Sequence, residues 1–189
     1  MSTYDLIRNR RTIRKFQQRK LERVQLERMI DAARLAPSAN NMQPLKYIIV
    51  NDEEKVKPFF KYVNWAGYIA PAGNPKTGEE PVAYIVILLD TQVRESGYEL
   101  DVGAAVQNIL ITALEEGIGS CWMGAINREG IQKLLDIPDR YKINTVVSLG
   151  YPSESPVAED ENGSTKYYKD DSGVLHVPKR KLSDIILKL

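Results

Sequence analysis

The chain has 189 residues, of which 43% are hydrophobic and 27% charged, and its formal net charge is +1. This composition is typical of one globular domain, and it argues against a nucleic-acid partner, which favours a strongly basic surface. No apolar run approaches the ~18 residues that span a bilayer, and the first residues lack the apolar stretch of a secretory signal. The single cysteine cannot form an internal disulfide, so we expect a cytoplasmic protein without a membrane partner.

The side chains that most often carry enzymatic chemistry are scarce. His176 and Cys121 are the only residues of their kinds, so a zinc site of the usual type is nearly excluded and we expect no metal. The GxSxG, GxGxxG and GxxxxGKS/T motifs are absent. A Cys121–His176 dyad is a weak alternative, because a lone cysteine is more often a small buried hydrophobe. If the chain is an enzyme, we expect a bound cofactor rather than a catalytic side chain to carry the chemistry.

Hydrophobic periodicity and turn residues predict helices and strands that alternate along the chain. The predicted helices span residues 2–10, 22–36, 53–62, 97–117 and 128–136, and a short terminal helix is marked by Leu182, Ile185, Ile186 and Leu189. The predicted strands span residues 45–52, 82–90 and 144–152, and a glycine-rich strand and turn span 117–126. Loops at 37–44 and 67–81 separate some of these elements, and the second is long enough to suggest a function. This alternation predicts helices packed around a central sheet.

Two further segments have distinctive patterns. The helix at 97–117 is apolar except for a narrow stripe, which predicts burial on two sides, either inside the chain or against a partner subunit. Residues 153–177 are polar, and turn signals at 161–163 and 170–173 predict a small hairpin between residues 166–169 and 174–177.

Cationic residues gather near both ends of the chain. The first group consists of Arg10, Arg11 and Arg14 around the hydroxyl of Thr12, and the second consists of Lys179, Arg180 and Lys181. Guanidinium forks and a hydroxyl that converge on one point suit a phosphate, whereas the alternative is an ordinary solvated basic face. If the second group folds back onto the first, the phosphate prediction gains support.

Two other segments suit a flat heterocyclic ligand. The loop PSANNMQP at 37–44 offers hydroxyl and amide groups from Ser38, Asn40, Asn41 and Gln43, although ordinary turn chemistry would also explain them. The glycines and alanine of the segment 117–126 would let the backbone approach such a ligand closely.

In this order, the motifs resemble the nitroreductase family of flavoenzymes. RRTIRKF at 10–16 resembles the family's RRSxRxF, and AARLAPSANNMQPLKYIIV at 32–50 resembles its AAxxAPSxxNxQPWxFxVV. DVGAAVQNILITALEEGIGSCWMG at 101–124 resembles its dimer helix and flavin-facing turn, and IPDRYKINTVVSLGYPSESP at 137–156 resembles its late strand. The resemblance implies an α+β fold, with a mostly antiparallel central sheet flanked by helices, in an intertwined homodimer. It implies one domain over 1–189, with a polar hairpin insert at about 158–177.

The resemblance also implies an FMN site, residue by residue. Arg10, Arg11, Thr12 and Arg14 would hold the ribityl phosphate. Pro37, Ser38 and Ala39 would cover the isoalloxazine ring of the partner subunit, with Asn41 and Gln43 near the flavin edge and ribityl chain. Met123 and Gly124 would offer backbone N–H groups near flavin N5 and O4, and one of Lys179, Arg180 and Lys181 would reach the phosphate. The chain departs from the family pattern at three places. Leu45 stands where Trp is common, the insert is the second departure, and the loop 67–81 has no match in the family pattern.

The implied function is an oxidoreductase in which FMN takes hydride from NADH or NADPH at N5. The flavin then passes it to a small electron-poor acceptor, such as a nitroaromatic or a quinone, by ping-pong kinetics, without a catalytic side chain. Two alternatives stay open: a flavoenzyme of the same fold that performs dehalogenation, flavin fragmentation or enone reduction, and a flavin-binding or sensing protein with little turnover.

Overall fold

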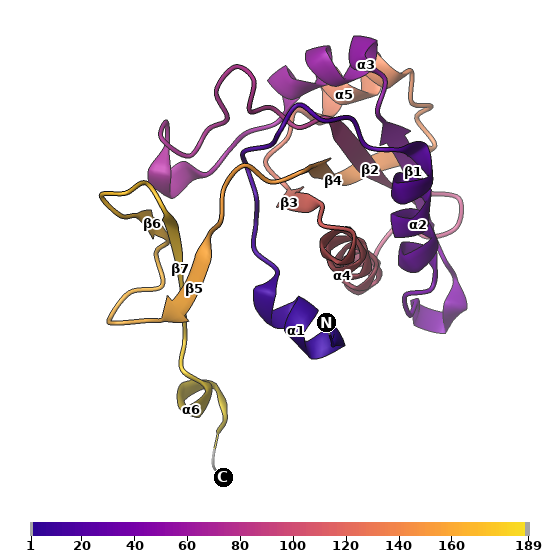
Figure 1. Ribbon diagram of the computed structural model, residues 1–189. Helices are drawn as coiled ribbons and strands as arrows, with labels where there is room; N and C mark the ends of the chain where they lie inside the picture. The colour runs from indigo at the N-terminus through magenta and orange to yellow at the C-terminus, as the bar shows by residue number, and fades with distance from the viewer. Residues whose placement is uncertain (1, 188–189) are drawn as a thin grey trace.

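The computed structural model describes residues 2–187 and is built on a four-stranded sheet (Figure 1). The strands are β1 (Leu45–Val50), β2 (Ala83–Asp90), β3 (Gly119–Met123) and β4 (Tyr141–Gly150), in the order β1-β2-β4-β3. All three pairings are antiparallel. Every residue of β2 is buried, as expected for the most apolar run of the sequence in a central position. The predicted α+β class with an antiparallel sheet is confirmed.

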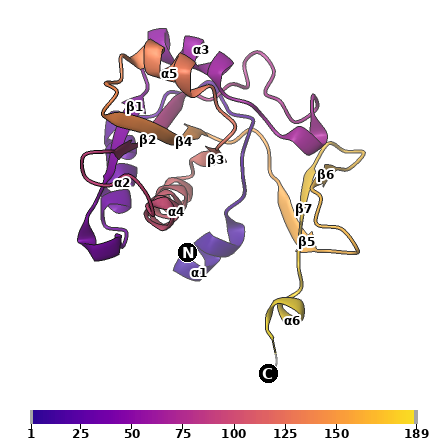
Figure 2. The ribbon, with the colours of Figure 1, turned by 180° about the vertical axis from the view of Figure 1, so that it is seen from behind.

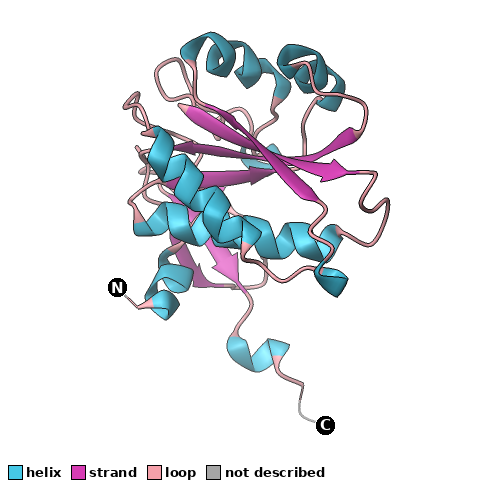
Figure 3. Cartoon of the chain, turned by 90° about the vertical axis from the view of Figure 1, so that its right-hand side faces the viewer, coloured by secondary structure: helices cyan, strands magenta, loops and turns pink. Residues whose placement is uncertain are grey.

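Helices cover both faces of this sheet (Figure 3). On one face, α2 (Arg23–Arg34) and α4 (Glu99–Glu115) enclose a core with β2 and β4. On the other face, α3 (Glu53–Phe59) and α5 (Arg128–Leu135) enclose a second core. A short N-terminal helix, α1 (Thr3–Asn9), lies against α4. Each helix exposes a polar stripe and buries an apolar one, so the sheet is insulated from water on both sides.

The predicted boundaries hold to within a few residues, with two instructive differences. The predicted helix 53–62 divides after Phe59 into α3 and a 3-10 turn, Phe60–Tyr62. Strand β4 begins at Tyr141 instead of residue 144, because Tyr141 and Lys142 pair with the end of β2 beyond an irregularity in register. Asn127 caps α5 through its side chain, which accepts from the Gly130 N–H.

The long helix α4 is buried on two sides within the chain. Val106 and Ile109 are fully buried in the core that α4 shares with the sheet. The helix α2 covers a second side, where the Asn108 amide donates to the Ala32 carbonyl at 2.9 Å. Ile111 and Leu114 remain only half-buried. The chain therefore supplies both buried sides, and the half-buried residues form the part of the helix that is open to a partner.

A second, three-stranded sheet stands to one side of the first (Figures 1 and 2). Its strands are β5 (Val157–Asp160), β6 (Tyr168–Lys169) and β7 (Leu175–Lys179). The strands β6 and β7 pair antiparallel across the predicted turn, and β5, which the sequence did not predict, pairs parallel to β7. The helix α6 (Leu182–Ile185) follows and is shorter than predicted; Leu189 lies outside the described residues. No described helix is long and apolar enough to cross a membrane.

His176 holds the strands of the small sheet together. Its Nδ1 lies 2.7 Å from Glu159 of β5, and its Nε2 lies 3.3 Å from Asp170 in the turn after β6. The Tyr168 ring stacks on the imidazole, and its hydroxyl donates to Glu159 at 2.9 Å. Two carboxylates can both be satisfied only when both ring nitrogens carry protons. The hydrogen bond to Glu159 accordingly raises the pKa of His176, burial opposes this, and the hydrogen bond to Asp170 adds to the rise. No recorded contact within 2–187 joins His176 to Cys121.

We predict that the small sheet weakens as the pH rises through the pKa of His176. This folded-state pKa lies above the unfolded value of about 6.5, so the stabilisation is fully present below about pH 6.5 and is lost as the pH rises through the folded-state pKa. The pKa values of Glu159 and Asp170 are lowered, so their contribution disappears only when the pH falls below about 4. Amide exchange protection of residues 175–179, measured against β2 between pH 5 and 9, checks this. His176→Phe keeps a ring but should abolish the dependence, and an unchanged profile in that variant would contradict the assignment.

Candidate functional site

The arginine-rich segment 10–16 runs along the open edge of the main sheet (Figure 1). Thr12 forms a parallel bridge with Ser120 of β3, the edge strand, and the Ile13 N–H donates to the Ser120 carbonyl at 2.9 Å. Ile13 is buried, and a Cβ on Gly119 would lie only 2.9 Å from its side chain. Glycine at this position is therefore what allows the segment to approach β3 so closely. The arginines on either side of Ile13 are fixed at the edge of the sheet.

These arginines are partly withdrawn from water and lack acidic partners. Arg10, Arg11 and Arg14 are half-buried, and no Asp or Glu within the described part of the chain forms an ion pair with them. Burial lowers the pKa of Arg10, and burial together with the neighbouring Arg10 charge lowers that of Arg11. The Arg14 guanidinium lies over the Tyr167 ring, 5.4 Å from its centroid. Half-buried cations without counter-charges are suited to binding an anion.

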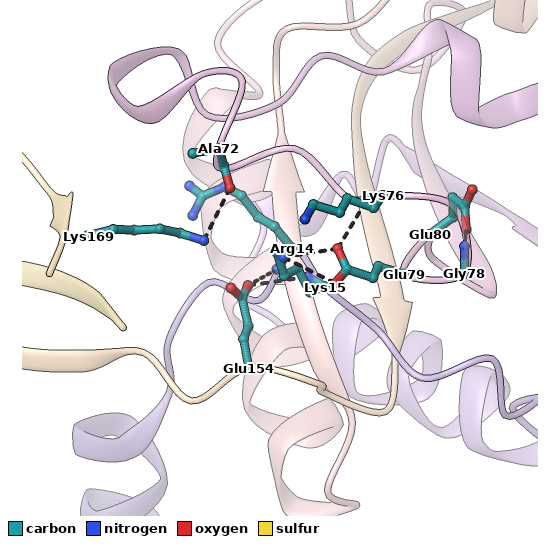
Figure 4. A network of polar contacts seen from close by, with 9 residues as sticks. All are labelled: Arg14, Lys15, Ala72, Lys76, Gly78, Glu79, Glu80, Glu154 and Lys169. Atoms are coloured by element: carbon teal, nitrogen blue, oxygen red, sulfur yellow. Dashed lines mark hydrogen bonds and ion pairs between the residues drawn. The ribbon is translucent and has the colours of Figure 1, made fainter. Parts of the chain in front are cut away.

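Acidic side chains bind the backbone around Arg14 rather than its guanidinium (Figure 4). The Glu154 carboxylate accepts from the Arg14 N–H at 2.6 Å and from the Lys15 N–H at 3.2 Å. The Lys15 ammonium pairs with Glu79 at 3.0 Å, and Glu79 also accepts from the Lys76 N–H. In Figure 4 the ammonium of Lys76 extends toward Arg14. The loop 67–81, which the sequence left without a match, is thus fastened to the arginine segment.

The insert is fastened to the same loop. The Tyr167 ring, which faces Arg14, also lies 5.0 Å from the Tyr68 ring. The Lys169 ammonium donates to the Ala72 carbonyl at 3.2 Å. Nothing in the local sequence could have revealed these contacts, because the partners lie about a hundred residues apart. The loop and the insert together form a wall beside Arg14.

The loop 37–43 is held in one conformation by Asp101. The Ser38 hydroxyl donates to this carboxylate at 2.5 Å, the Ala39 N–H donates at 3.3 Å, and the Gln43 N–H donates to the Ser38 hydroxyl at 2.9 Å. Asp101 is 4% exposed and lies in the first turn of α4, where a negative charge is favourable. Asn41 and Gln43 have positive φ values, and the Gln43 amide donates to the Asn41 side chain. The loop is preformed although its surface is exposed.

The end of β3 presents backbone to open space. Met123 is buried, whereas Gly124 is exposed, and a Cβ on Gly124 would meet no atom within 4 Å. Among residues 2–187 the Gly124 N–H has no recorded acceptor. Ser120 and Gly124 are four residues apart, about 13 Å along an extended strand, so the arginine segment and Gly124 lie within reach of one extended ligand.

One chain does not bring all the predicted residues together. The arginine segment and Met123–Gly124 share the open edge of β3, but no recorded contact within the described chain joins either of them to the loop 37–43. Lys179, the last residue of β7, and Arg180 and Lys181, which precede α6, are exposed and have no recorded contact to residues 10–14. Ser120 and Glu154 thus hold the main chain of residues 10–14 in place. The second cationic group does not fold back onto the first group within the chain.

Two pockets lie elsewhere on the molecule. One of about 570 Å³ lies behind the loop 37–43, between α2, β1 and α4, and one of about 650 Å³ lies beside α3 and residues 77–82. Neither is lined by Arg10, Arg14, Met123 or Gly124. Neither of these two pockets therefore belongs to the edge of β3.

Comparison with known proteins identifies the family. The model of the Nitroreductase family matches residues 7–151. A protein of Archaeoglobus fulgidus named "Putative NADH dehydrogenase/NAD(P)H nitroreductase" is 35% identical over 156 residues, which are 79% of this chain and 84% of that protein. The chain belongs to the nitroreductase family.

Solved structures share the fold. A nitroreductase family protein from Clostridium novyi NT is 30% identical and has a TM-score of 0.67, with 80% of this chain and 87% of that chain covered. An FMN-dependent nitroreductase from Clostridium difficile R20291 is 24% identical and has a TM-score of 0.64, with 88% and 91% covered. The antiparallel sheet with helices on both faces is therefore the family fold.

We predict that Asp101→Asn loosens the loop 37–43 and destabilises the protein by about 1–3 kcal/mol, the range for hydrogen bonds to a buried charged group. The amide keeps the size of the side chain but exchanges one of its two acceptors for a donor. Urea unfolding and the backbone dynamics of residues 38–43 are the measurements. Asp31→Asn is the matched control, because Asp31 forms an exposed pair with Arg34 that contributes at most ~1 kcal/mol. Equal losses in the two variants would count against the role of Asp101.

Proposed function

We propose that the protein is an FMN-dependent oxidoreductase that takes hydride from NADH or NADPH and passes it to a small electron-poor acceptor, such as a nitroaromatic or a quinone. The observation that carries the proposal is the row of half-buried arginines without acidic partners on the edge of β3, beside the exposed backbone of Gly124. Membership of the nitroreductase family and the name of the Archaeoglobus fulgidus relative support the same chemistry.

The residues at the edge of β3 fit FMN. Arg10 and Arg14 supply positive charge and paired N–H donors, and Thr12 supplies a hydroxyl, so this segment would hold the phosphate. Arg11 adds positive charge, while its guanidinium donates to the carbonyls of Arg8 and Arg10. The backbone N–H of Gly124 would face the ring, because the absence of a Cβ at Gly124 leaves space for a flat group. The N–H of Met123, which the sequence also assigned to the ring, belongs to the residue paired with Val146 and points toward β4. When bound, FMN supplies N5, the atom that accepts hydride from the nicotinamide and returns it to the acceptor.

The chain's own residues contribute position and charge. Reduction makes the flavin more negative, so a nearby cation favours the reduced state. Arg14 is the candidate, because Glu154 fixes its backbone and Tyr167 supports its guanidinium without neutralising it. No acidic or basic side chain is required for hydride transfer itself, which agrees with a sequence that has one histidine. Nicotinamide and acceptor would use the same space in turn, as in ping-pong kinetics.

A homodimer would complete the site. The preformed loop, with Pro37, Ser38, Ala39, Asn41 and Gln43, is exposed and far from its own chain's arginines, so we propose that it covers the FMN of the partner subunit. Lys179, Arg180 or Lys181 would reach the phosphate in the same assembly. Apolar residues of α6 that are more than half exposed, Leu182, Ile185 and Ile186, are suited to packing on a second copy. The single cysteine is buried and unpaired, in keeping with the cytoplasm as the compartment that we propose.

We predict that the purified protein is yellow and releases FMN on heating, and that Arg10→Gln and Arg14→Gln each weaken FMN binding about ten- to hundredfold. This is the range for losing one charge-assisted hydrogen bond. Fluorescence titration of the apoprotein with FMN measures the dissociation constants. Arg23→Gln, which breaks an exposed pair with Glu27 on α2, is the control and should bind FMN normally. Undiminished FMN binding in both edge variants would refute the site.

The catalytic half of the proposal is tested on the same preparation. Anaerobic NADH or NADPH should bleach the flavin absorbance, and a nitroaromatic or a quinone should then restore it. A flavin that stays oxidised under excess NADH and NADPH would favour the flavin-binding alternative instead. Bleaching without recolouring by either acceptor would point to a family member of different chemistry.

We predict that the triple variant Leu182→Ser, Ile185→Ser, Ile186→Ser is monomeric and loses most of its bound FMN. These side chains are exposed in one chain, so their replacement should leave its own fold intact. Light scattering after gel filtration gives the mass, and circular dichroism checks folding. Val24→Ser, which replaces an exposed apolar residue of α2, should stay dimeric with FMN bound. A folded wild-type monomer with stoichiometric FMN would disprove the shared site.

A further inference from the structure

A chain of two hydrogen bonds connects the end of β3 to β4. The Trp122 indole N–H donates to the Thr145 hydroxyl at 2.8 Å, and that hydroxyl donates to the Met123 carbonyl at 2.7 Å. Thr145 is 3% exposed, and both distances are those of well-formed hydrogen bonds. Because the indole can only donate, it directs the hydroxyl hydrogen toward the carbonyl, and each bond polarises the next.

The Met123 carbonyl and the Gly124 N–H belong to the same peptide group. The group is planar and trans, so its C=O and N–H point in opposite directions. Thr145 lies on β4, the inner neighbour of β3, and draws the carbonyl inward. The Gly124 N–H must then point outward, to the open edge along which Thr12 and Ile13 lie. This is the edge that carries the arginine segment.

The Met123–Gly124 peptide lies where the strand pairing ends, since Met123 is the last residue of β3 and is opposite Val146 of β4. Glycine admits nearly all backbone dihedrals, so the Met123–Gly124 peptide can rotate at low energy. The next carbonyl, that of Gly124, is held weakly by Arg128 at 3.4 Å. Arg128 itself is anchored on the carbonyls of Ile143 and Asn144 at 3.0 and 2.6 Å. Thr145 therefore adds a short, buried side-chain contact to the end of the strand pairing, and this contact holds the direction in which the Gly124 N–H points.

We propose that Thr145 is a positioning residue, whose hydroxyl holds the Met123–Gly124 peptide so that the Gly124 N–H is aimed at the flavin ring. The inference rests on the proposed function, since it assigns that N–H to FMN. Thr145 does not touch the cofactor and acts only through the peptide that it fixes. A correctly aimed donor contributes to FMN affinity and acts differently on the oxidised and reduced rings, because reduction changes the charge and protonation of the ring edge.

The test compares Thr145→Val, which has nearly the same shape without the hydroxyl, with Thr145→Ser, which keeps it. In Thr145→Val, the FMN dissociation constant should rise about three- to tenfold, the range for one neutral hydrogen bond. The ratio of reduced to oxidised binding constants, read from the two-electron midpoint potential, should change at least threefold. Thr145→Ser should restore both quantities to within twofold of the wild type. A Thr145→Val protein with unchanged FMN affinity and potential would overturn the proposal, even if its melting temperature fell.

Two further variants guard against a general effect on folding. Ser148→Ala removes a fully buried hydroxyl from the same strand that has no recorded partner among residues 2–187, so neither binding nor potential should move. Trp122→Phe keeps the Thr145 hydroxyl but removes the donor that directs it. Its side chain is 46% exposed, so folding should survive, and the FMN affinity should fall by less than in Thr145→Val. If Thr145→Val does not fold, an unaltered FMN affinity and potential in Trp122→Phe would overturn the proposal.

Nitrogen-15 relaxation of the apoprotein separates this inference from the proposed function. Gly124 should become more mobile in Thr145→Val and remain rigid in Thr145→Ser and Ser148→Ala. If the wild type binds no FMN, the proposed function fails, and with it the assignment of this N–H to a flavin. If the wild type binds FMN and Gly124 is as rigid in Thr145→Val as in the wild type, the inference about Thr145 fails alone.

Discussion

The structure depends on how positive charge is held at the edge of a sheet. Ile13 and Phe16 anchor the arginine segment, and Gly119 and Gly150 lack the Cβ atoms that would collide with them at 2.9 Å. This packing places three guanidinium groups where water is partly excluded. The nearby carboxylate of Glu154 accepts hydrogen bonds from backbone N–H groups and does not pair with a guanidinium. The charge of these arginines therefore has no acidic partner among the described residues. A solvated basic face, the alternative that the sequence allowed, would not draw its arginines into a partly buried position.

The remaining parts of the site follow the geometry of this edge. The backbone at Gly124 lies farther along the same strand, and Thr145 fixes its orientation from the interior. The loop 37–43 is equally well fixed, by Asp101, yet it lies apart from the arginines of its own chain. A loop that is preformed, exposed and without a local role is what a shared site between two subunits requires. In this view the edge of β3 in one subunit binds the phosphate and the ring edge of FMN, and the preformed loop 37–43 of the other subunit covers them.

Much of this could be predicted from the sequence, because the decisive signals are local. Hydrophobic periodicity located α2, α4 and α5, and the apolar runs located β1, β2 and β4. The arginine segment was recognisable by its composition. The positioning residues were not, because Glu154 acts on a backbone 140 residues away and Asp101 on a side chain 63 residues away. Strand β5 was missed for the same reason: its four residues are mostly exposed and only two are apolar, and pairing with β7 makes them a strand.

The choice of acceptor would depend on the part of the chain that departs most from the family pattern. The loop 67–81 and the insert meet through Tyr68 and Tyr167, and the latter ring supports Arg14. The insert in turn is held together by His176 between two carboxylates. If Arg14 binds FMN as proposed, the residues that shape the acceptor space and the residue that favours the reduced flavin form one connected unit. A change of acceptor during evolution would then require the loop and the insert to change together, without disturbing the contacts that hold Arg14.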